Sequence, residues 1–291
     1  MSLKDVLTYN PKQRRLFVMK RRLVLSGLVL ICMLGLTLTM GTVQAGETPG
    51  LWKYMEVFKN AKYIDLTHTW GENTPHWKGF DPAVIKTIYN HDEHGFLVYL
   101  YTHVGQWGTH CDAPVHFHKG LRTLKDIPCQ EMFLPLVAID CHKQVAANPD
   151  YAITMEDVRA WEAKYGPIPE GSFVAMRTDW YTRWPSQEKM MNADEKGVLH
   201  YPAWSQEVLE YLYNVRKVTA TGHETTDTDG GLRVTKDDYG MEAWILKQDK
   251  YQIEILANLD KVPEAGAFVV VTWPKPELAS GFPARVFAIV P

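Results

Sequence analysis

The sequence predicts an α/β protein with one mixed sheet, built as a single domain. Short runs rich in β-branched and aromatic residues recur along the chain, and capped helix-like runs lie between them. No stretch rich in proline, glycine and serine divides the chain after its first 50 residues. The 291 residues are 46% hydrophobic and 22% charged, which is ordinary for a globular protein. We therefore expect one α/β domain over residues 46–291.

Eight runs are predicted as strands because they are short and rich in residues that favour extended backbone. They are residues 63–67, 97–104, 136–139, 173–176, 218–221, 252–256, 268–272 and 285–290. Three runs are predicted as helices from their capping residues, Thr154, Ser205 and Thr235. These helices are expected over residues 154–164, 205–213 and 235–248.

The amino terminus has the layout of an export signal. Lys20, Arg21 and Arg22 precede an uncharged apolar stretch over residues 23–40, and a small-residue cleavage pattern follows at residues 43–45. We predict residues 1–45 as an export signal, with Met19 as an alternative start, and expect the mature protein in the periplasm. The alternative is an uncleaved membrane anchor with the domain outside the cytoplasm.

Charge and cysteine content narrow the classes of partner. The net charge of −3 and the isoelectric point near 6.4 argue against a nucleic-acid surface. The mature chain keeps Cys111, Cys129 and Cys141, so one disulfide is possible in an oxidising compartment, but the sequence does not select the pair.

Residues 106–116 carry the densest chemistry in the chain. If this run is a strand, Gln106, His110, Asp112 and His116 share one face, because alternate side chains of a strand point the same way. An imidazole and a carboxylate two residues apart, about 7 Å between Cα atoms, can converge on one divalent ion. The alternative is a structural polar network. Cys111 is expected to point away from this face.

Two later segments could complete such a site. Residues 222–231 follow a predicted strand and include His223, Glu224, Asp227 and Asp229; the segment is either a self-capped turn or part of the site. Glu254 lies within an apolar strand pattern, where an acid is buried only if it is paired or binds metal. The alternative for Glu254 is an edge strand that exposes it to water.

The residues His110, Asp112 and His116, within Gly-Thr-His-x-Asp-x-Pro-x-His, resemble the signature of the cyclase family, which includes bacterial kynurenine formamidase and isatin hydrolase. The Arg-Thr-Asp-Trp segment at residues 177–180 and the Gly-Phe-Pro-Ala-Arg segment at residues 281–285 resemble other marks of the family. The resemblance implies a swivelling β/β/α fold, one or two divalent ions, manganese or zinc, and a homodimer or homotetramer.

Two positions depart from the family pattern. Gln106 stands where a histidine is usual, and Glu242, twelve residues before Glu254, stands where a later histidine is usual. The metal ligands implied by the resemblance and these departures are Gln106, His110, Asp112, His116, Glu242 and Glu254. Oxygen donors in place of imidazoles move the preference of the site from zinc toward manganese or magnesium.

These residues predict a metal-dependent hydrolase that cleaves an amide, a cyclic amide or a lactone in a small molecule. A bound ion would polarise the carbonyl group and activate a water molecule. His116 is predicted to transfer the proton, with Glu224 as the base if His116 binds metal instead. The alternatives are a metal-dependent lyase or dehydratase, and a periplasmic protein that binds a metal and a carboxylate without turnover.

Overall fold

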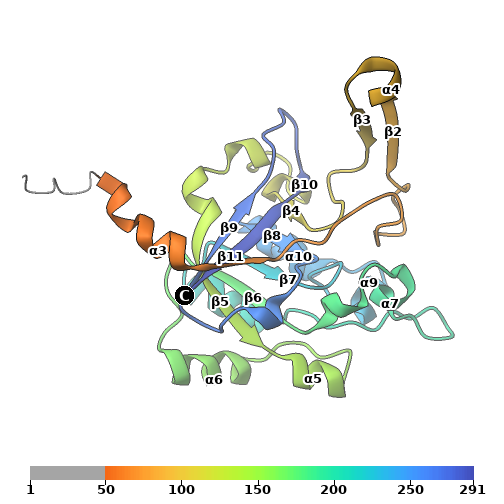
Figure 1. Ribbon diagram of the computed structural model, residues 1–291. Coiled ribbons are helices and arrows are strands. Elements are labelled where there is room, and N and C mark those ends of the chain that lie inside the picture. Colours follow the sequence, from red (N-terminus) through yellow and green to blue (C-terminus); the bar gives the residue numbers. More distant parts are fainter. Residues whose placement is uncertain (1–49) are drawn as a thin grey trace, which may run out of the picture. The chain divides into compact units, whose positions relative to one another are not determined.

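The computed structural model describes residues 50–291 (Figure 1). The predicted export signal and the alternative start therefore lie outside the described residues. The described part begins with a 3-10 helix, Gly50–Tyr54, followed by helix α3, Met55–Asn60. Between residues 50 and 291, no helix combines the length and apolar character needed to cross a membrane.

Nine strands form one mixed sheet in the order β1-β11-β9-β5-β6-β7-β8-β4-β10 (Figure 1). The strands are β1 (Lys62–Asp65), β4 (His110–Asp112), β5 (Phe133–Asp140), β6 (Phe173–Arg177), β7 (Ala220–His223), β8 (Tyr251–Glu254), β9 (Ala267–Thr272), β10 (Gly281–Pro283) and β11 (Arg285–Val290). Strands β5 to β8 run parallel, and every other pairing is antiparallel. The predicted mixed α/β class is confirmed.

Helices cover one face of this sheet. They are α5 (His142–Ala147), α6 (Met155–Tyr165), α7 (Gln187–Met191), α8 (Gln206–Glu210), α9 (Gly231–Val234) and α10 (Gly240–Lys247). Helix α6 begins as predicted, because Thr154 and Asp157 form a reciprocal capping box. Helix α8 continues into a π-helical turn, Tyr211–Val215. The prediction of one helix over residues 235–248 is wrong at its start: Thr235 follows α9, and α10 begins only at Gly240.

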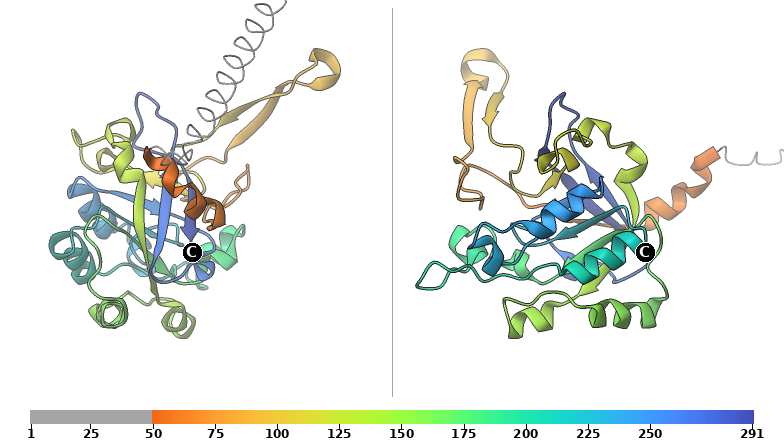
Figure 2. Two further views of the ribbon diagram at one scale, coloured as in Figure 1. Left: turned by 60° about the vertical axis from the view of Figure 1, so that its left-hand side comes forward. Right: turned by 180° about the vertical axis from the view of Figure 1, so that it is seen from behind.

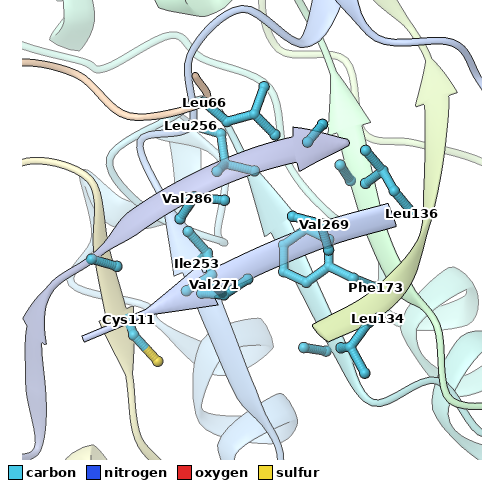
Figure 3. Packing of buried hydrophobic residues seen from close by; sticks show 14 of the residues in the cluster. Leu66, Cys111, Leu134, Leu136, Phe173, Ile253, Leu256, Val269, Val271 and Val286 are labelled. Carbon is cyan, nitrogen blue, oxygen red and sulfur yellow. The ribbon is translucent and has the colours of Figure 1, made fainter. Parts of the chain in front are cut away.

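Two apolar cores lie on the two sides of the sheet, as the alternation along β5 illustrates. Leu136 belongs to a first core that collects residues from β4, β5, β6, β8, β9 and β11 (Figure 3). Val137 belongs to a second core, which includes Val158 of α6, Leu209 of α8 and Ile245 of α10. A sheet packed in this way on both faces needs strands that are apolar on both sides, and β5 and β6 have that character.

Strands β2 (Val84–Tyr89) and β3 (Val98–Thr102) form a separate two-stranded ribbon, with α4 (His91–His94) between them. The ribbon projects away from the main sheet (Figures 1 and 2). The prediction of a strand over residues 97–104 is therefore correct in type, but this strand pairs only with β2. We call β2, α4 and β3 the arm.

Candidate metal centre

The run 106–116 is not one strand, which corrects the prediction made from its alternation. Only His110–Asp112 is extended in a ladder. Gly108 has a φ of 63° just before it, and Pro114 opens a 3-10 turn, Pro114–His116, just after it. The polar side chains of the run therefore approach from a turn, a strand and a 3-10 turn. Cys111 points into the first core, as expected.

A cavity of about 220 Å³ brings most of the predicted ligands together. Its buried end, which we call the acidic floor, consists of His110, Asp112, Glu242 and Glu254. Its open end, which we call the aromatic rim, is lined by Pro75, His76, Trp77, Phe80 and Phe117. Gln106, His116 and Tyr239 also line the cavity. A metal-binding floor and an apolar rim are the usual parts of a small-molecule site.

The first potential ligand set is His110, Asp112 and Glu254. Strands β4 and β8 are antiparallel neighbours with His110 directly opposite Glu254. His110 Nε2 lies 3.4 Å from Asp112 Oδ2 and 3.5 Å from Glu254 Oε2. His110 Nδ1 lies 2.8 Å from the carbonyl oxygen of Gly108, which can only accept. The proton is thus on Nδ1, and the Nε2 lone pair of neutral His110 is free for a metal.

The second potential set is Asp112, His116 and Glu242. His116 Nε2 lies 3.9 Å from Glu242 Oε1. Because α10 begins at Gly240, Glu242 lies in its first turn, where its N–H donates to Asp229 at 3.1 Å. In each set the ligand atoms lie within 4.8 Å of one another. Asp112 belongs to both sets and would be shared if both held an ion.

The electrostatics of the floor fit a divalent cation. Burial and neighbouring carboxylates raise the pKa of both Glu242 and Glu254 well above the usual range. Burial also raises the pKa of Asp112, but His110, His116 and Gln252 together lower it more and bring this pKa down to about 2. Asp112 Oδ1 is buried without a hydrogen-bond partner. No Lys or Arg is among the residues that line the cavity. Burial of its carboxylates therefore costs free energy unless a bound cation neutralises their charge.

His223 on β7 is a site residue that the ligand prediction missed. Trp204 Nε1 can only donate, and it lies 3.3 Å from His223 Nδ1, so the proton of neutral His223 is on Nε2. That Nε2 lies 3.4 Å from Glu254 Oε1. Burial lowers the pKa of His223 to about 3. His223 Nε2 is buried without a hydrogen-bond partner, so its N–H lies beside the Glu254 carboxylate but is not bonded to it, whereas His110 offers the metal a lone pair.

Gln252 was also missed, although it lies two residues before Glu254 and so shares its face of β8. Its Nε2 donates to Glu254 Oε1 at 3.1 Å and to Asp112 Oδ2 at 3.4 Å. Thr228 fixes the amide by donating to Gln252 Oε1 at 2.6 Å. The alternative of a solvent-exposed Glu254 is wrong, because β8 lies between β7 and β4 and Glu254 is 4% exposed.

The structure does not bring Glu224 to the cavity. Its Oε2 accepts hydrogen bonds from Thr178 N, Thr178 Oγ1 and Trp180 N at 2.9, 2.6 and 3.0 Å. Burial raises the pKa of Glu224 to about 7 despite these donors. Glu224 directly follows His223 in extended chain, so the two side chains leave on opposite sides. Gln106 does line the cavity, with its Nε2 3.5 Å from Ser280 Oγ.

The cysteine prediction is settled within residues 50–291. Cys111, Cys129 and Cys141 are all free thiols there. Burial and Asp112 raise the pKa of Cys111, so this thiol is a poor nucleophile or ligand despite its place in the signature run.

Comparison with known proteins agrees with this geometry. The chain is 32% identical over 267 residues to an isatin hydrolase of Roseibium aggregatum, covering 89% of this chain and 96% of that enzyme. A solved isatin hydrolase A from Ralstonia solanacearum superposes with a TM-score of 0.78 at 30% identity, covering 84% of this chain and 99% of that one. A solved isatin hydrolase bound to the product analogue thioisatinate gives a TM-score of 0.76 at 30% identity, covering 82% and 95%.

The fold, the acidic floor and the similarity to known enzymes together define a metal-dependent hydrolase. Residues 64–230 match the family model described as "Putative cyclase", and the chain belongs to the cyclase family. The predicted family, enzyme class and dependence on a metal are confirmed. Nothing in the comparisons supports the lyase or the non-catalytic binding protein.

Proposed function

We propose that this enzyme opens a flat aromatic cyclic amide of the isatin type. Water adds to the amide carbonyl, a C–O bond forms and the C–N bond breaks, which gives a carboxylate and an aryl amine. The observation that carries this proposal is a buried floor of His110, Asp112 and Glu254 beneath an aromatic rim. Isatin hydrolases are among the solved relatives, one of them bound to a product analogue.

The resident ion is proposed to be manganese, held by His110, Asp112 and Glu254. One imidazole and two carboxylates form a harder donor set than the imidazole-rich sites that favour zinc. One ion is proposed, because a second ion held by Asp112, His116 and Glu242 would occupy the imidazole that is needed for proton transfer. Gln106 is proposed as a further oxygen ligand, because no residue in the described part of the chain is hydrogen-bonded to its Oε1. Elemental analysis of the purified protein tests both identity and count.

The chain's own residues divide the remaining work. When bound, the ion polarises the carbonyl oxygen and lowers the pKa of a bound water toward 7, roughly as in other metal hydrolases. His116 takes a proton from the attacking water and returns it to the leaving nitrogen. Its side chain is 29% exposed, so it reaches both the floor and solvent. Gln252 keeps Glu254 oriented by donating to its Oε1 at 3.1 Å.

The reaction is tested with metal-loaded enzyme and isatin in water enriched in heavy oxygen. Hydrolysis places one solvent oxygen in the product carboxylate, and a chelator stops it. Turnover without solvent oxygen in the product would instead identify a lyase, and tight binding without turnover would identify a binding protein.

A homodimer or homotetramer is proposed from the arm. Its large apolar side chains are 41–53% exposed: Val84, Ile88, Tyr89, Phe96, Leu97, Tyr99, Leu100 and Tyr101. Exposed apolar side chains grouped in this way mark a surface that a partner covers. A two-stranded ribbon is at best marginally stable alone in water, so a second copy of the chain is the proposed cover. Leu100→Asp is expected to halve the mass seen by light scattering, whereas an unchanged mass would contradict this.

Export to the periplasm with cleavage after residue 45 is proposed from the basic, apolar and small-residue segments of the first 45 residues. Amino-terminal sequencing of the protein from the periplasmic fraction tests it. A full-length protein in the membrane fraction would support the anchor instead.

A further inference from the structure

His76 is a fixed imidazole at the rim, and the reaction described above does not use it. Its ring stacks on Trp107 with centroids 4.8 Å apart and planes 28° apart. Trp107 is fully buried and lies three residues before His110. The backbone of His76 is held at both ends by Gln187, which accepts from its N–H at 2.7 Å and donates to its carbonyl at 2.8 Å. The ring therefore has one orientation, and it lines the cavity.

The hydrogen bond of Nδ1 determines what this ring can recognise. His76 Nδ1 lies 2.6 Å from the carbonyl oxygen of Thr74. A carbonyl oxygen only accepts, so Nδ1 carries the proton and Nε2 of the neutral ring carries a lone pair. Within residues 50–291, no side chain or backbone group is hydrogen-bonded to this Nε2. His76 thus presents an unpaired acceptor at a cavity wall.

The side chains around His76 at the rim offer a buried N–H few acceptors. Pro75, Phe80, Phe117 and Ile255 have apolar side chains, and Asp227, which also lines the cavity, already accepts from Tyr201 and Thr226. The hydroxyl of Tyr239 already accepts from Trp77 Nε1 at 2.8 Å. An amide N–H that enters such a cavity without an acceptor loses a hydrogen bond to water, which weakens binding.

We propose that His76 is a specificity-determining residue that accepts the amide N–H of the substrate at Nε2, so that the enzyme selects N–H cyclic amides over N-alkylated ones. This inference rests on the proposed function and adds the substrate feature that the rim recognises, which is the amide N–H. A methyl group on the amide nitrogen removes the donor and adds volume where the imidazole lies. A lactone likewise has no donor at that position.

The test compares isatin with N-methylisatin on metal-loaded enzyme, using the wild type and His76→Phe. Phenylalanine keeps the stacking on Trp107 but has no acceptor. We expect kcat/KM for isatin to fall about tenfold, mostly through KM, while kcat/KM for N-methylisatin changes less than twofold. His76→Gln, which regains an acceptor oxygen, is expected to recover part of the loss. N-methylisatin turnover also reports whether each variant is folded.

His142→Phe is the matched control. His142 Nδ1 also has a hydrogen-bonding partner, Asp140 Oδ1 at 2.5 Å, but His142 does not line the cavity. We expect both substrates to be unaffected by this change. Equal losses for both substrates in His76→Phe would show a packing role only, and unchanged isatin kinetics would show no role; each overturns the inference. Wild-type enzyme that opens neither compound would overturn the proposed function itself.

Discussion

The acidic floor and the aromatic rim are built in different ways, although they line one cavity. The floor lies on β4 and β8, two neighbouring strands whose backbones are paired along the sheet, and on the first turn of α10. The rim belongs mainly to residues 71–80, a loop outside both sheets. Side chains hold this loop: Gln187 on the His76 backbone, and Tyr239 on Trp77. The metal chemistry is thus placed on rigid structure, and substrate choice on a segment that can vary without unfolding the sheet.

His110→Ala is expected to have the largest effect on metal binding at the acidic floor. It removes the one imidazole of the first ligand set, so we expect loss of bound metal and a fall in kcat/KM of about three orders of magnitude or more. Elemental analysis and kinetics on the same sample measure both. His142→Ala, a histidine outside the cavity, is the control and should retain metal and activity. Full activity in metal-free His110→Ala protein would refute the assignment.

Glu224 does not line the cavity, so its substitution is expected to change stability and not catalysis. Its pKa is about 7 in the folded protein against 4.5 ordinarily. The folded state therefore keeps a proton that the unfolded state loses, and stability present below pH 4.5 is lost as the pH rises to 7. The full effect is about 3 kcal/mol.

Glu224→Gln mimics the protonated carboxyl group, so the variant should lose this part of the pH dependence. We expect its free energy of unfolding, relative to that of the wild type, to rise between pH 5 and pH 8 by up to about 3 kcal/mol. Urea unfolding at both pH values measures the difference. Parallel profiles for the two proteins would place the pKa of Glu224 near its ordinary value.

Substitution of His223 tests whether this residue binds the metal itself or only lies beside the ligand Glu254. His223→Ala is expected to weaken metal affinity about 10–100-fold and to leave kcat nearly unchanged at saturating metal, because it removes the polar N–H that lies 3.4 Å from Glu254 Oε1. Trp204→Phe removes the N–H that fixes the tautomer and should give a smaller loss in the same direction. Titration with manganese measures both. A His223→Ala protein unable to bind metal at any concentration would make His223 a ligand.

The smallest expected effect is at the rim. Trp77→Phe keeps an aromatic ring but removes the hydrogen bond to Tyr239. A bond of this kind contributes about 1 kcal/mol, so KM should rise about fivefold with kcat and metal content unchanged. A drop in metal content would show that rim and floor are not separable.

The sequence predicted the ligand types at the floor better than it predicted how they are placed. His110, Asp112 and Glu254 do meet, because antiparallel β4 and β8 put them opposite one another. Their meeting does not come from an eleven-residue strand, since Gly108 and Pro114 end the strand on both sides. Alternation alone could not reveal this, because it says nothing about where pairing stops.

Other features required tertiary information. The position of the proton on His223 depends on Trp204, nineteen residues away in sequence, whose indole sets the tautomer. The composition of residues 97–104 matches that of strands inside the sheet, so it predicts a strand but not the separate arm. Gln252 could have been found: it lies in register with Glu254, on the polar face of an otherwise apolar strand.

Trp70 links the arm to the floor. Its ring lies edge-on to Tyr101 and His103, with centroids 5.7 and 5.0 Å apart, and its Cβ packs over Gly108. The carbonyl of Gly108 sets the proton position on His110. If a second copy covers the arm, dissociation on dilution would loosen the very contacts that orient the metal ligand. Specific activity would then depend on enzyme concentration, falling below the dimer's dissociation constant and returning when the protein is concentrated again.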